Sequence, residues 1–278
     1  MSHIGVFVLP DNSMTNSDGI SYVKSIGLAA FEPAPGGELL HPDYEIAKML
    51  RDKALQEEVV LPCFSAFANI SGENRYEEVE RLKQYIEIAA IMNIPLFHHT
   101  IAPELDSSKI SQPFEQILDI AVPLVHELYD YAMERNVRCV YENQGYYFNG
   151  FRNFKMFLDA VERPVGLVMD MGNIAFALEN IDCFARDFAH RVVHVHVKDY
   201  KLQENAVESA YKLPNGKFLA SAILGEGHIF IEKALKELKK HDYQGYYMIE
   251  HSPINDGFVE QKQCIDNLRS MLSKINDE

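Results

Sequence analysis

Short apolar runs, rich in β-branched and aromatic residues, alternate with longer segments of helical periodicity along the whole chain. The helical period is clearest in four segments, 73–93, 111–136, 230–245 and 260–275. The apolar runs number eight: 3–9, 28–33, 59–67, 94–100, 137–143, 164–170, 192–199 and 245–251. Strands that each lead into a helix are typical of parallel βαβ units, so the pattern predicts one parallel sheet covered by helices.

The number of these units and the chain length narrow the α/β class to a (β/α)8 TIM barrel. Such barrels typically have ~250 residues, and this chain has 278, which we interpret as a single domain over 1–278. An open, doubly wound sheet is the alternative, but no GxGxxG motif follows the first run. The longest interruption, 200–227, follows the seventh run and is expected to lie over one mouth of the barrel.

Charge and composition restrict the partners of the chain. The formal net charge is -15, from 41 acidic and 26 basic residues. This charge repels phosphate backbones and acidic lipid surfaces, so we expect no nucleic-acid partner and no membrane association. No apolar segment approaches the length of a membrane span, and the four cysteines form no CxxC pair. Free thiols in a reducing cytoplasm are the expectation, and the sequence leaves the oligomeric state open, a homo-oligomer included.

Polar side chains lie at the carboxyl ends of the predicted strands. In a TIM barrel these ends meet at one rim, where the chemistry takes place. The fifth to eighth runs each deliver one such side chain: Glu142, Asp170, His196 and Glu250. Three carboxylates in an apolar mouth would repel one another, and a divalent cation removes that repulsion. Three oxygens and one nitrogen suit Mn first, and also Mg, Co or Zn, so we expect one divalent metal ion.

The alternation in "VVHVHVKD" places two imidazoles on one face of the seventh strand. Residues two apart in a strand share a face, so His194, His196 and Lys198 are expected on one side and the intervening valines on the other. His196 would face inward as a ligand, with the valines packed outward against helices. His194 lies one pleat deeper and is interpreted as a core histidine or as a hydrogen-bond partner of a ligand.

Other polar residues at the same rim are candidates for binding substrate. Glu32 ends the second run, and two adjacent histidines, His98 and His99, end the fourth. One of these histidines should face the mouth while its neighbour points away, and the alternation does not say which. The expected substrate-binding set is Glu32, His98, Asn173 and Lys198. The segment "NQGYYFNGF" would supply aromatic faces for sugar C–H groups, or would anchor a loop.

Five segments resemble those of a known superfamily. They are "VYENQG", "LVMDMGN", "HVHVKD", "LGEGHI" and "DYQGYYMIEHS". In order and spacing they are similar to the xylose isomerase-like TIM barrels, the sugar isomerases and epimerases that include ketose 3-epimerases and hydroxypyruvate isomerase, with inosose dehydratase and endonuclease IV as further members. The resemblance extends over nearly the whole chain and is strongest from residue 137 onward.

The resemblance implies roles for particular residues. It implies that Glu142, Asp170, His196 and Glu250 bind one divalent metal ion, and that Glu142 and Glu250 also act as acid and base. Glu226, in "GEG", is interpreted as part of a structural turn.

Two positions depart from the pattern of the relatives. Asn173 stands where many relatives have a histidine, and Leu202 stands where ketose epimerases have an arginine. Lys198 or Lys201 would have to replace that arginine. The set of additional histidines and carboxylates that is typical of endonuclease IV is incomplete in this chain, which argues against a nuclease.

Together these features predict a divalent-metal-dependent sugar isomerase or epimerase that acts on a ketose or related polyol, a small-molecule partner. The metal would chelate the carbonyl and a neighbouring hydroxyl oxygen and stabilise a cis-enediolate. Glu142 or Glu250 would remove a proton, and the other would return one. Two alternatives stay open. One is a metal-dependent dehydratase of an inosose-like keto-polyol, with Lys198 assisting the departing hydroxyl; the other is a non-catalytic barrel that retains the metal and binds sugar.

Overall fold

Strands and helices alternate as the sequence predicts. The computed structural model describes residues 3–207 and 209–277. Glu208, in the insertion formed by residues 200–227, therefore lies outside the described residues. The strands of the main sheet are β1 (Ile4–Val6), β2 (Ala30–Phe31), β3 (Cys63–Ala66), β4 (Leu96–His99), β5 (Arg138–Glu142), β6 (Gly166–Asp170), β7 (Val192–Val197) and β11 (Tyr247–Ile249). The α-helices are α1 (Asn16–Ser25), α2 (Tyr44–Glu57), α3 (Arg75–Ile91), α4 (Phe114–Met133), α5 (Gly145–Phe148), α6 (Phe151–Val161), α7 (Ile181–Phe188), α8 (Ile231–Lys240) and α9 (Gly257–Asp277). Short 3-10 helices occupy Gly37–Leu39, Ser107–Lys109, Asn173–Ala177 and Ala189–Arg191.

The main sheet is parallel throughout and closes into a barrel. Its strand order is β2-β1-β11-β7-β6-β5-β4-β3. The ring closes between β2 and β3: Phe31 N donates to Val60 O at 3.0 Å, and Val60 N donates to Ala29 O at 2.7 Å. Ser65 N donates to Pro33 O at 3.1 Å. The (β/α)8 TIM barrel is therefore confirmed, with a second strand of only 2 residues.

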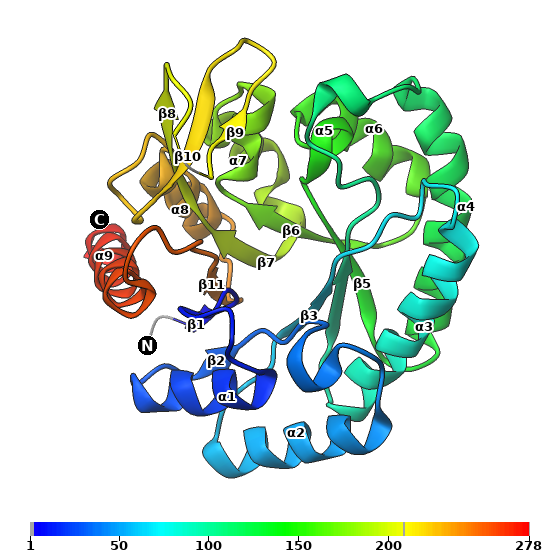
Figure 1. The fold of residues 1–278 in the computed structure, drawn as a ribbon, viewed down its shortest axis with the longest axis vertical. Coiled ribbons are helices and arrows are strands. Elements are labelled where there is room, and N and C mark those ends of the chain that lie inside the picture. The colour runs from blue at the N-terminus through cyan, green and yellow to red at the C-terminus, as the bar shows by residue number, and fades with distance from the viewer. Residues whose placement is uncertain (1–2, 208, 278) are drawn as a thin grey trace.

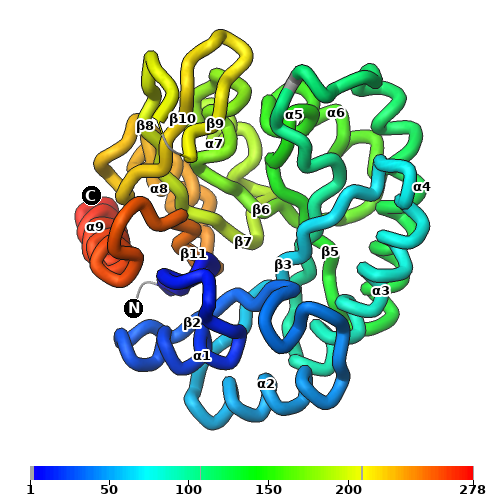
Figure 2. The backbone as a smooth tube through the Cα atoms, viewed as in Figure 1, coloured from blue at the N-terminus to red at the C-terminus, as the bar shows by residue number. Residues whose placement is uncertain are grey.

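The helices form a ring around the strands (Figure 1). The backbone trace places the first and last helices beside each other in this ring (Figure 2). Tyr22 of α1 and Phe258 of α9 meet edge to face, with ring centroids 5.8 Å apart. This contact joins the two ends of the chain, so the helical layer closes where the sequence begins and ends.

The segment after β7 forms a smaller antiparallel sheet of β8 (Asp199–Gln203), β9 (Tyr211–Lys212) and β10 (Phe218–Ala222). In Figure 1 this sheet stands beside α7 at the upper left. Tyr211 and Lys212 line a cavity together with Phe67, which follows β3, and with residues 103–106, which follow β4. Since β3 and β4 end at the carboxyl face of the barrel, the insertion covers part of that mouth, as the sequence predicts.

A β-bulge in β7 changes the predicted alternation. Leu167 of β6 pairs with Val192, whereas the next residue, Val168, pairs with His194. Val193 is the extra residue, and it packs with the apolar side chains inside the barrel. The prediction that Val193 faces the helices is therefore wrong, because the bulge turns two successive side chains toward the interior.

Gly166 makes room for this bulge. A Cβ atom at Gly166 would lie 2.5 Å from Val193 Cγ2 and 2.9 Å from Val140 Cγ1. Beyond the bulge the alternation resumes, and Val195 and Val197 belong to the core cluster that the helices share. The upper half of β7 thus follows the predicted pattern, while its lower half does not.

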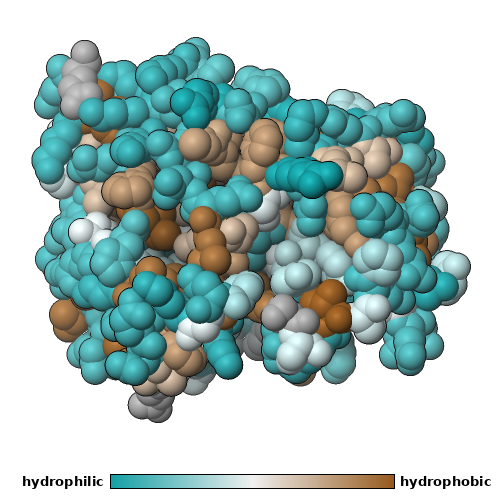
Figure 3. All heavy atoms as spheres, turned by 90° about the horizontal axis from the view of Figure 1, so that it is seen from above, coloured by the Kyte–Doolittle hydropathy of each residue, from teal (hydrophilic) through white to brown (hydrophobic). Residues whose placement is uncertain are grey.

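The surface and the cysteines agree with the composition. No helix in the described part of the chain is long and apolar enough to cross a bilayer. The cysteines are free, with Cys63, Cys139 and Cys264 buried and Cys183 exposed. The face in Figure 3 shows hydrophobic residues in small groups among hydrophilic ones.

Candidate metal centre and active site

Four side chains from four neighbouring strands meet at the mouth of the barrel. Each offers one ligand atom, and these atoms all lie within 4.8 Å of one another: Glu142, Asp170, His196 and Glu250. Glu142 and Asp170 end β5 and β6, His196 belongs to β7, and Glu250 follows β11. Asp170 and His196 are 0% exposed and Glu142 is 8% exposed. The structure thus brings together the residues that the sequence predicts as metal ligands.

Backbone amides orient the Asp170 carboxylate. Its Oδ1 accepts hydrogen bonds from Gly172 N at 2.7 Å and from Asn173 N at 2.8 Å. The side chain of Asn143, which follows Glu142, donates to Asp170 O and accepts from Asp170 N, both at 3.1 Å. These bonds hold the ends of β5 and β6 together, and Asp170 Oδ2 is left facing the Lys198 ammonium at 3.1 Å.

Lys198 reaches the same group from just beyond β7. Its Nζ lies 2.5 Å from Glu250 Oε1 and 3.1 Å from Asp170 Oδ2. The stem of Lys198 packs on Gly172, where an added Cβ would lie 3.0 Å from the Cβ and Cγ of the lysine. The ammonium therefore neutralises part of the carboxylate charge. Lys198, expected to bind substrate, lies in direct contact with two of the candidate ligands.

Burial and charge separate the pKa values in this group. Burial raises the pKa of Asp170 to about 8, although the charge of Lys198 acts against this rise. Burial acts in the same sense on Glu250, but Lys198 and His196 together outweigh it and hold the pKa of that carboxyl well below its usual range. Burial would lower the pKa of His196, yet the charge of Glu32 and hydrogen bonds to carboxylates raise it well above its usual value. A metal ion binds the deprotonated forms and would displace these protons.

The chemistry of these side chains fits a bound cation. His98 Nε2 is buried without a hydrogen-bond partner, whereas Asp170 Oδ2 and Glu250 Oε2 are buried and have charge contacts, with Lys198 Nζ at 3.1 Å and with His196 Nδ1 at 3.2 Å. Unsatisfied buried polar atoms are rare in proteins and often mark an ion-binding or catalytic position. Three carboxylates and one imidazole nitrogen are ligands that Mn²⁺, Mg²⁺, Co²⁺ and Zn²⁺ accept. These residues therefore fit one divalent metal ion.

The two nitrogens of His196 face opposite sides. Nδ1 lies 2.8 Å from Glu142 Oε1 and 3.2 Å from Glu250 Oε2, within the candidate ligand set. Nε2 lies 3.1 Å from Glu32 Oε1, deeper in the barrel. The ring orientation thus assigns Nδ1 to the candidate metal centre.

Glu32 lies at the centre of a hydrogen-bonded group below the four candidate ligands. It is 1% exposed. It accepts hydrogen bonds from Ser65 Oγ at 2.5 Å and from His194 Nε2 at 2.6 Å, in addition to His196. Glu32 is expected from the sequence to bind substrate, and the structure places its carboxylate inside the barrel, hydrogen-bonded to these three side chains. Glu32, Cys63 and His194 also offer ligand-type atoms within 4.8 Å of one another.

His98 faces the candidate site and His99 points away from it. His98 Nδ1 lies 3.0 Å from Ser65 Oγ, and its Nε2 lies 3.6 Å from Glu142 Oε2. His99 Nε2 lies 3.0 Å from the hydroxyl oxygen of Tyr141, on the outer face of the sheet. The question that the alternation leaves open is thereby answered.

Two neighbours of the site are absent from the sequence-based set. Phe7, just beyond β1, stacks on the His196 ring with centroids 4.8 Å apart and planes at 22°. Ser65 of β3 pairs in register with His98 of β4 and lies at the same level of the barrel. Both lie near the carboxyl ends of their runs, a position that could have identified them, but neither carries a charge that draws attention.

A buried aspartate explains the "LGEGHI" motif. Asp199 accepts hydrogen bonds from Gly227 N at 3.0 Å and from Ile229 N at 3.2 Å. Glu226 is exposed and accepts a hydrogen bond from Gln263 Nε2 at 2.7 Å. Glu226 therefore lies in a turn that Asp199 holds, which agrees with a structural interpretation of this glutamate.

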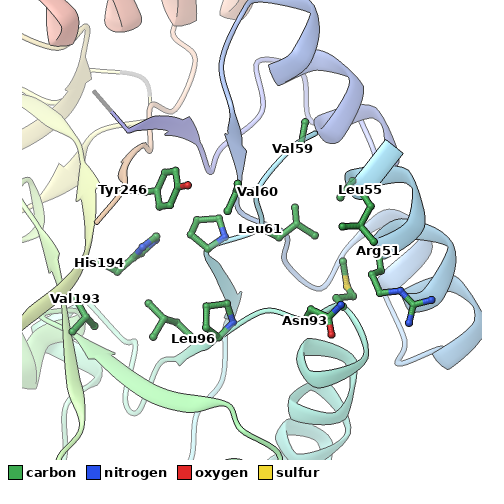
Figure 4. A pocket seen from close by; sticks show the side chains of 14 residues that line it. Arg51, Leu55, Val59, Val60, Leu61, Asn93, Leu96, Val193, His194 and Tyr246 are labelled. Carbon is green, nitrogen blue, oxygen red and sulfur yellow. The ribbon is translucent and has the colours of Figure 1, made fainter. Parts of the chain in front are cut away.

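A pocket of roughly 390 Å³ opens at the opposite, amino-terminal end of the strands (Figure 4). Its walls are mainly apolar, and Leu61 lies between its two ends. His194 and Tyr246 lie near each other at one end, and Arg51 lies at the other. His194 belongs both to this pocket and to the group around Glu32, whereas the four candidate ligands lie at the other mouth of the barrel.

Comparisons with known proteins agree with this architecture. An inosose dehydratase of Clostridium perfringens is 26% identical over 247 residues, which cover 82% of this chain and 80% of the relative. A xylose isomerase-like TIM barrel protein of Mycobacterium smegmatis, solved in complex with magnesium, shares the fold with a TM-score of 0.74 at 16% identity, over 99% and 98% of the two chains. A D-tagatose 3-epimerase-like protein has a TM-score of 0.72 at 20% identity, over 98% and 99%. The family model described as xylose isomerase-like TIM barrel matches residues 20–268. This chain therefore belongs to the xylose isomerase-like TIM barrel family.

Proposed function

We propose that this chain is a divalent-metal-dependent enzyme that moves a proton next to the carbonyl group of a ketose or related polyol, and so isomerises or epimerises it. The observation that carries the proposal is the meeting of Glu142 and Glu250 with Asp170 and His196 within 4.8 Å. In the sheet order, β6 and β7 separate β5 from β11. The two glutamates therefore approach a shared substrate from different sides.

The chemistry divides between the cation and the two glutamates. One divalent ion, Mn²⁺ first, would be held by these four residues and would supply Lewis-acid stabilisation of the negative charge that develops on a sugar oxygen. One glutamate accepts the proton from the carbon next to the carbonyl. The other returns a proton to the same carbon in epimerisation, or to the neighbouring carbon in isomerisation. General acid and base catalysis of this kind contributes typically ~10²- to 10⁴-fold.

Polar groups around the cluster would bind the hydroxyl groups of the substrate. His98 Nε2 and Asn173 Nδ2 are buried and have no hydrogen-bond partner. Lys198 adds a cation that contacts both Glu250 and Asp170. These three side chains can satisfy sugar oxygens that would otherwise lose their water on entering the mouth.

A second candidate function is dehydration of an inosose-like keto-polyol. It is favoured by Lys198, whose Nζ lies 2.5 Å from Glu250 Oε1 and could assist a departing hydroxyl group. The similarity to inosose dehydratase also supports this outcome. Both candidates share the first proton abstraction and diverge at the second step, where the intermediate is either reprotonated or loses a hydroxyl group.

Turnover in deuterated water separates the two candidates. The metal-free protein is reloaded with Mn²⁺ and incubated with a panel of ketoses and inososes, and the products are followed by NMR and mass spectrometry. Isomerisation or epimerisation introduces solvent deuterium at a carbon next to the carbonyl and keeps the formula otherwise unchanged, whereas a dehydratase releases water. Glu142→Gln should lose the exchange, and Glu226→Gln, a change of an exposed glutamate outside the cluster, should retain it. A Mn²⁺-loaded protein that binds sugar without exchange or water loss would instead be a non-catalytic barrel.

A further inference from the structure

The side chain that faces the second nitrogen of His196 is the carboxylate of Glu32, which is 1% exposed. Glu32 Oε1 lies 3.1 Å from His196 Nε2, and Glu32 Oε2 lies 3.2 Å from it. The other nitrogen of the ring, Nδ1, faces Glu142 and Glu250. A histidine that binds a metal through Nδ1 carries its proton on Nε2, and that proton points here at Glu32.

The Glu32 carboxylate is itself held on several sides. Ser65 Oγ donates to Oε1 at 2.5 Å, and His194 Nε2 lies 2.6 Å from Oε2. His194 precedes His196 by two residues and shares its face of β7. Phe7 stacks on the face of the His196 ring and limits its rotation. The imidazole is thus fixed by its face and by its Nε2 edge before any ion arrives.

We infer that Glu32 is a positioning residue for the candidate metal centre: it fixes His196 in the tautomer that presents Nδ1 to the ion. This inference rests on the proposed function, because it needs a metal at the four ligands. Carboxylates that accept the second N–H of a ligating histidine orient the ring and increase its basicity, and their loss typically weakens metal affinity by about 10- to 100-fold. Glu32 would therefore act through His196 without touching substrate.

A second metal ion at Glu32, Cys63 and His194 is the competing explanation for this group. Glu32 and His194 already satisfy each other at 2.6 Å. Burial raises the pKa of the Cys63 thiol well above its usual value, which disfavours the thiolate that a metal requires. The group is better explained as a hydrogen-bonded support, so the expected stoichiometry is one ion per chain.

Metal titration of the full chain tests the inference without any assay of turnover. Mn²⁺ is titrated calorimetrically into metal-free wild type, Glu32→Gln and Glu260→Gln. Glu260 is a matched control, because it is also buried and also accepts a hydrogen bond from a buried histidine, His251, at 2.9 Å. We expect Glu32→Gln to bind Mn²⁺ about 10- to 100-fold more weakly than wild type and Glu260→Gln to bind like wild type.

A second readout reports the tautomer directly. In Zn²⁺-loaded protein with ¹⁵N-labelled histidine, NMR should show His196 bound through Nδ1 and protonated on Nε2, and Glu32→Gln should lose this single state. If Glu32→Gln does not fold, Ser65→Ala leaves the carboxylate in place but removes one support, and it should weaken Mn²⁺ binding in the same direction to a smaller extent.

The outcomes separate this inference from the proposed function. If wild type binds no divalent ion, the proposed function fails, and the inference fails with it. If wild type binds one ion and Glu32→Gln binds equally well, or if both glutamate variants lose the same affinity, only the inference is overturned. Two ions per chain, one of them lost in Cys63→Ser, would also overturn it and assign Glu32 to a second metal site.

Discussion

Replacing Lys198 with methionine tests how the metal-free barrel tolerates its buried carboxylates. The lysine Nζ lies 2.5 Å from Glu250 Oε1 and 3.1 Å from Asp170 Oδ2, and its side chain is only 10% exposed. Methionine keeps the stem but removes the charge, and breaking a buried ion pair in this way costs roughly 3–5 kcal/mol. With an unfolding entropy of about 2.1 cal/mol/K per residue over 278 residues, the Tm of the metal-free protein should fall by about 5–9 °C.

The loss of stability should increase with pH. Burial has already raised the pKa of Asp170 to about 8, against the charge of Lys198. Without that charge the pKa of Asp170 rises further, and the lowered pKa of Glu250 rises as well. A carboxyl whose pKa is higher in the folded state destabilises the fold progressively as pH rises from its unfolded pKa to its folded pKa. At about pH 5 the two carboxyls of the variant are protonated, so its stability is closest to that of wild type. The loss of stability relative to wild type increases toward about pH 9.

Thermal unfolding followed by circular dichroism measures this effect. Wild type and Lys198→Met are compared with a chelator present at both pH values, and then with excess Mn²⁺. Because the ammonium and the metal ion compete for the same oxygens, Mn²⁺ should raise the Tm of the variant more than that of wild type. Lys155→Met is the control, since Lys155 lies on α6 and pairs at 2.5 Å with Asp159, both of them exposed. The reasoning fails if the metal-free variant has the same Tm as wild type at both pH values, or if Mn²⁺ raises the Tm of the variant less than that of wild type.

The same geometry leads to three further predictions. Glu142→Gln should slow solvent-deuterium exchange into the substrate by ~10²- to 10⁴-fold, as NMR would show, and an unchanged rate would contradict its role in proton transfer. Mn²⁺ affinity should increase with pH up to about 8, because the raised pKa values of Asp170 and His196 mean that the ion displaces protons. Calorimetry in buffers of different ionisation enthalpy should detect this net proton release. An affinity that does not change with pH would contradict the prediction. Gly166→Ala places a Cβ 2.5 Å from Val193 Cγ2 and should destabilise the fold by ~1–3 kcal/mol, seen as a lower urea midpoint. Adding Val193→Ala in the same chain should restore part of the lost stability. An unchanged midpoint in the single variant would contradict the close contact.

Periodicity in the sequence was sufficient to locate the strands and the four candidate ligands. Glu142 and Asp170 end apolar runs whose period places their last residues at one rim, and that placement depends only on strand direction. Helices α3, α4, α8 and α9 are located for the same reason, since each is long enough to show its own period, whereas α5 spans only 4 residues. The architecture was therefore predictable from local pattern and unit count.

Depth within the barrel was not predictable in the same way. Glu32 ends an apolar run as Glu142 does, yet its carboxylate is bonded to Ser65 and His194 below the candidate ligands. The difference arises from the stagger of the strands around the ring, which no single run contains. Charge at a strand end therefore identified both residues, but only the structure separates the candidate ligand from its proposed support.

Val193 and Lys198 show the same limit on a smaller scale. The bulge at Val193 depends on the space that Gly166 leaves on the neighbouring strand. Lys198 was expected to bind substrate, and its position between Glu250 and Asp170 depends on contacts between strands that lie far apart in the sequence. Both outcomes are set by tertiary neighbours rather than by the period of β7.

The short seam between β2 and β3 makes the candidate metal centre sensitive to transient opening of the barrel between these two strands. Few backbone bonds close this seam, because β2 has only 2 residues and pairs with Val60 ahead of β3. Glu32 is the next residue along the chain, so a fluctuation that parts the seam also withdraws the carboxylate from His196. An ion that binds only the closed ring stabilises that ring by mass action. Amide protection at Phe31 and Val60 is therefore expected to report, from the backbone alone, how tightly the closed barrel would bind a cation.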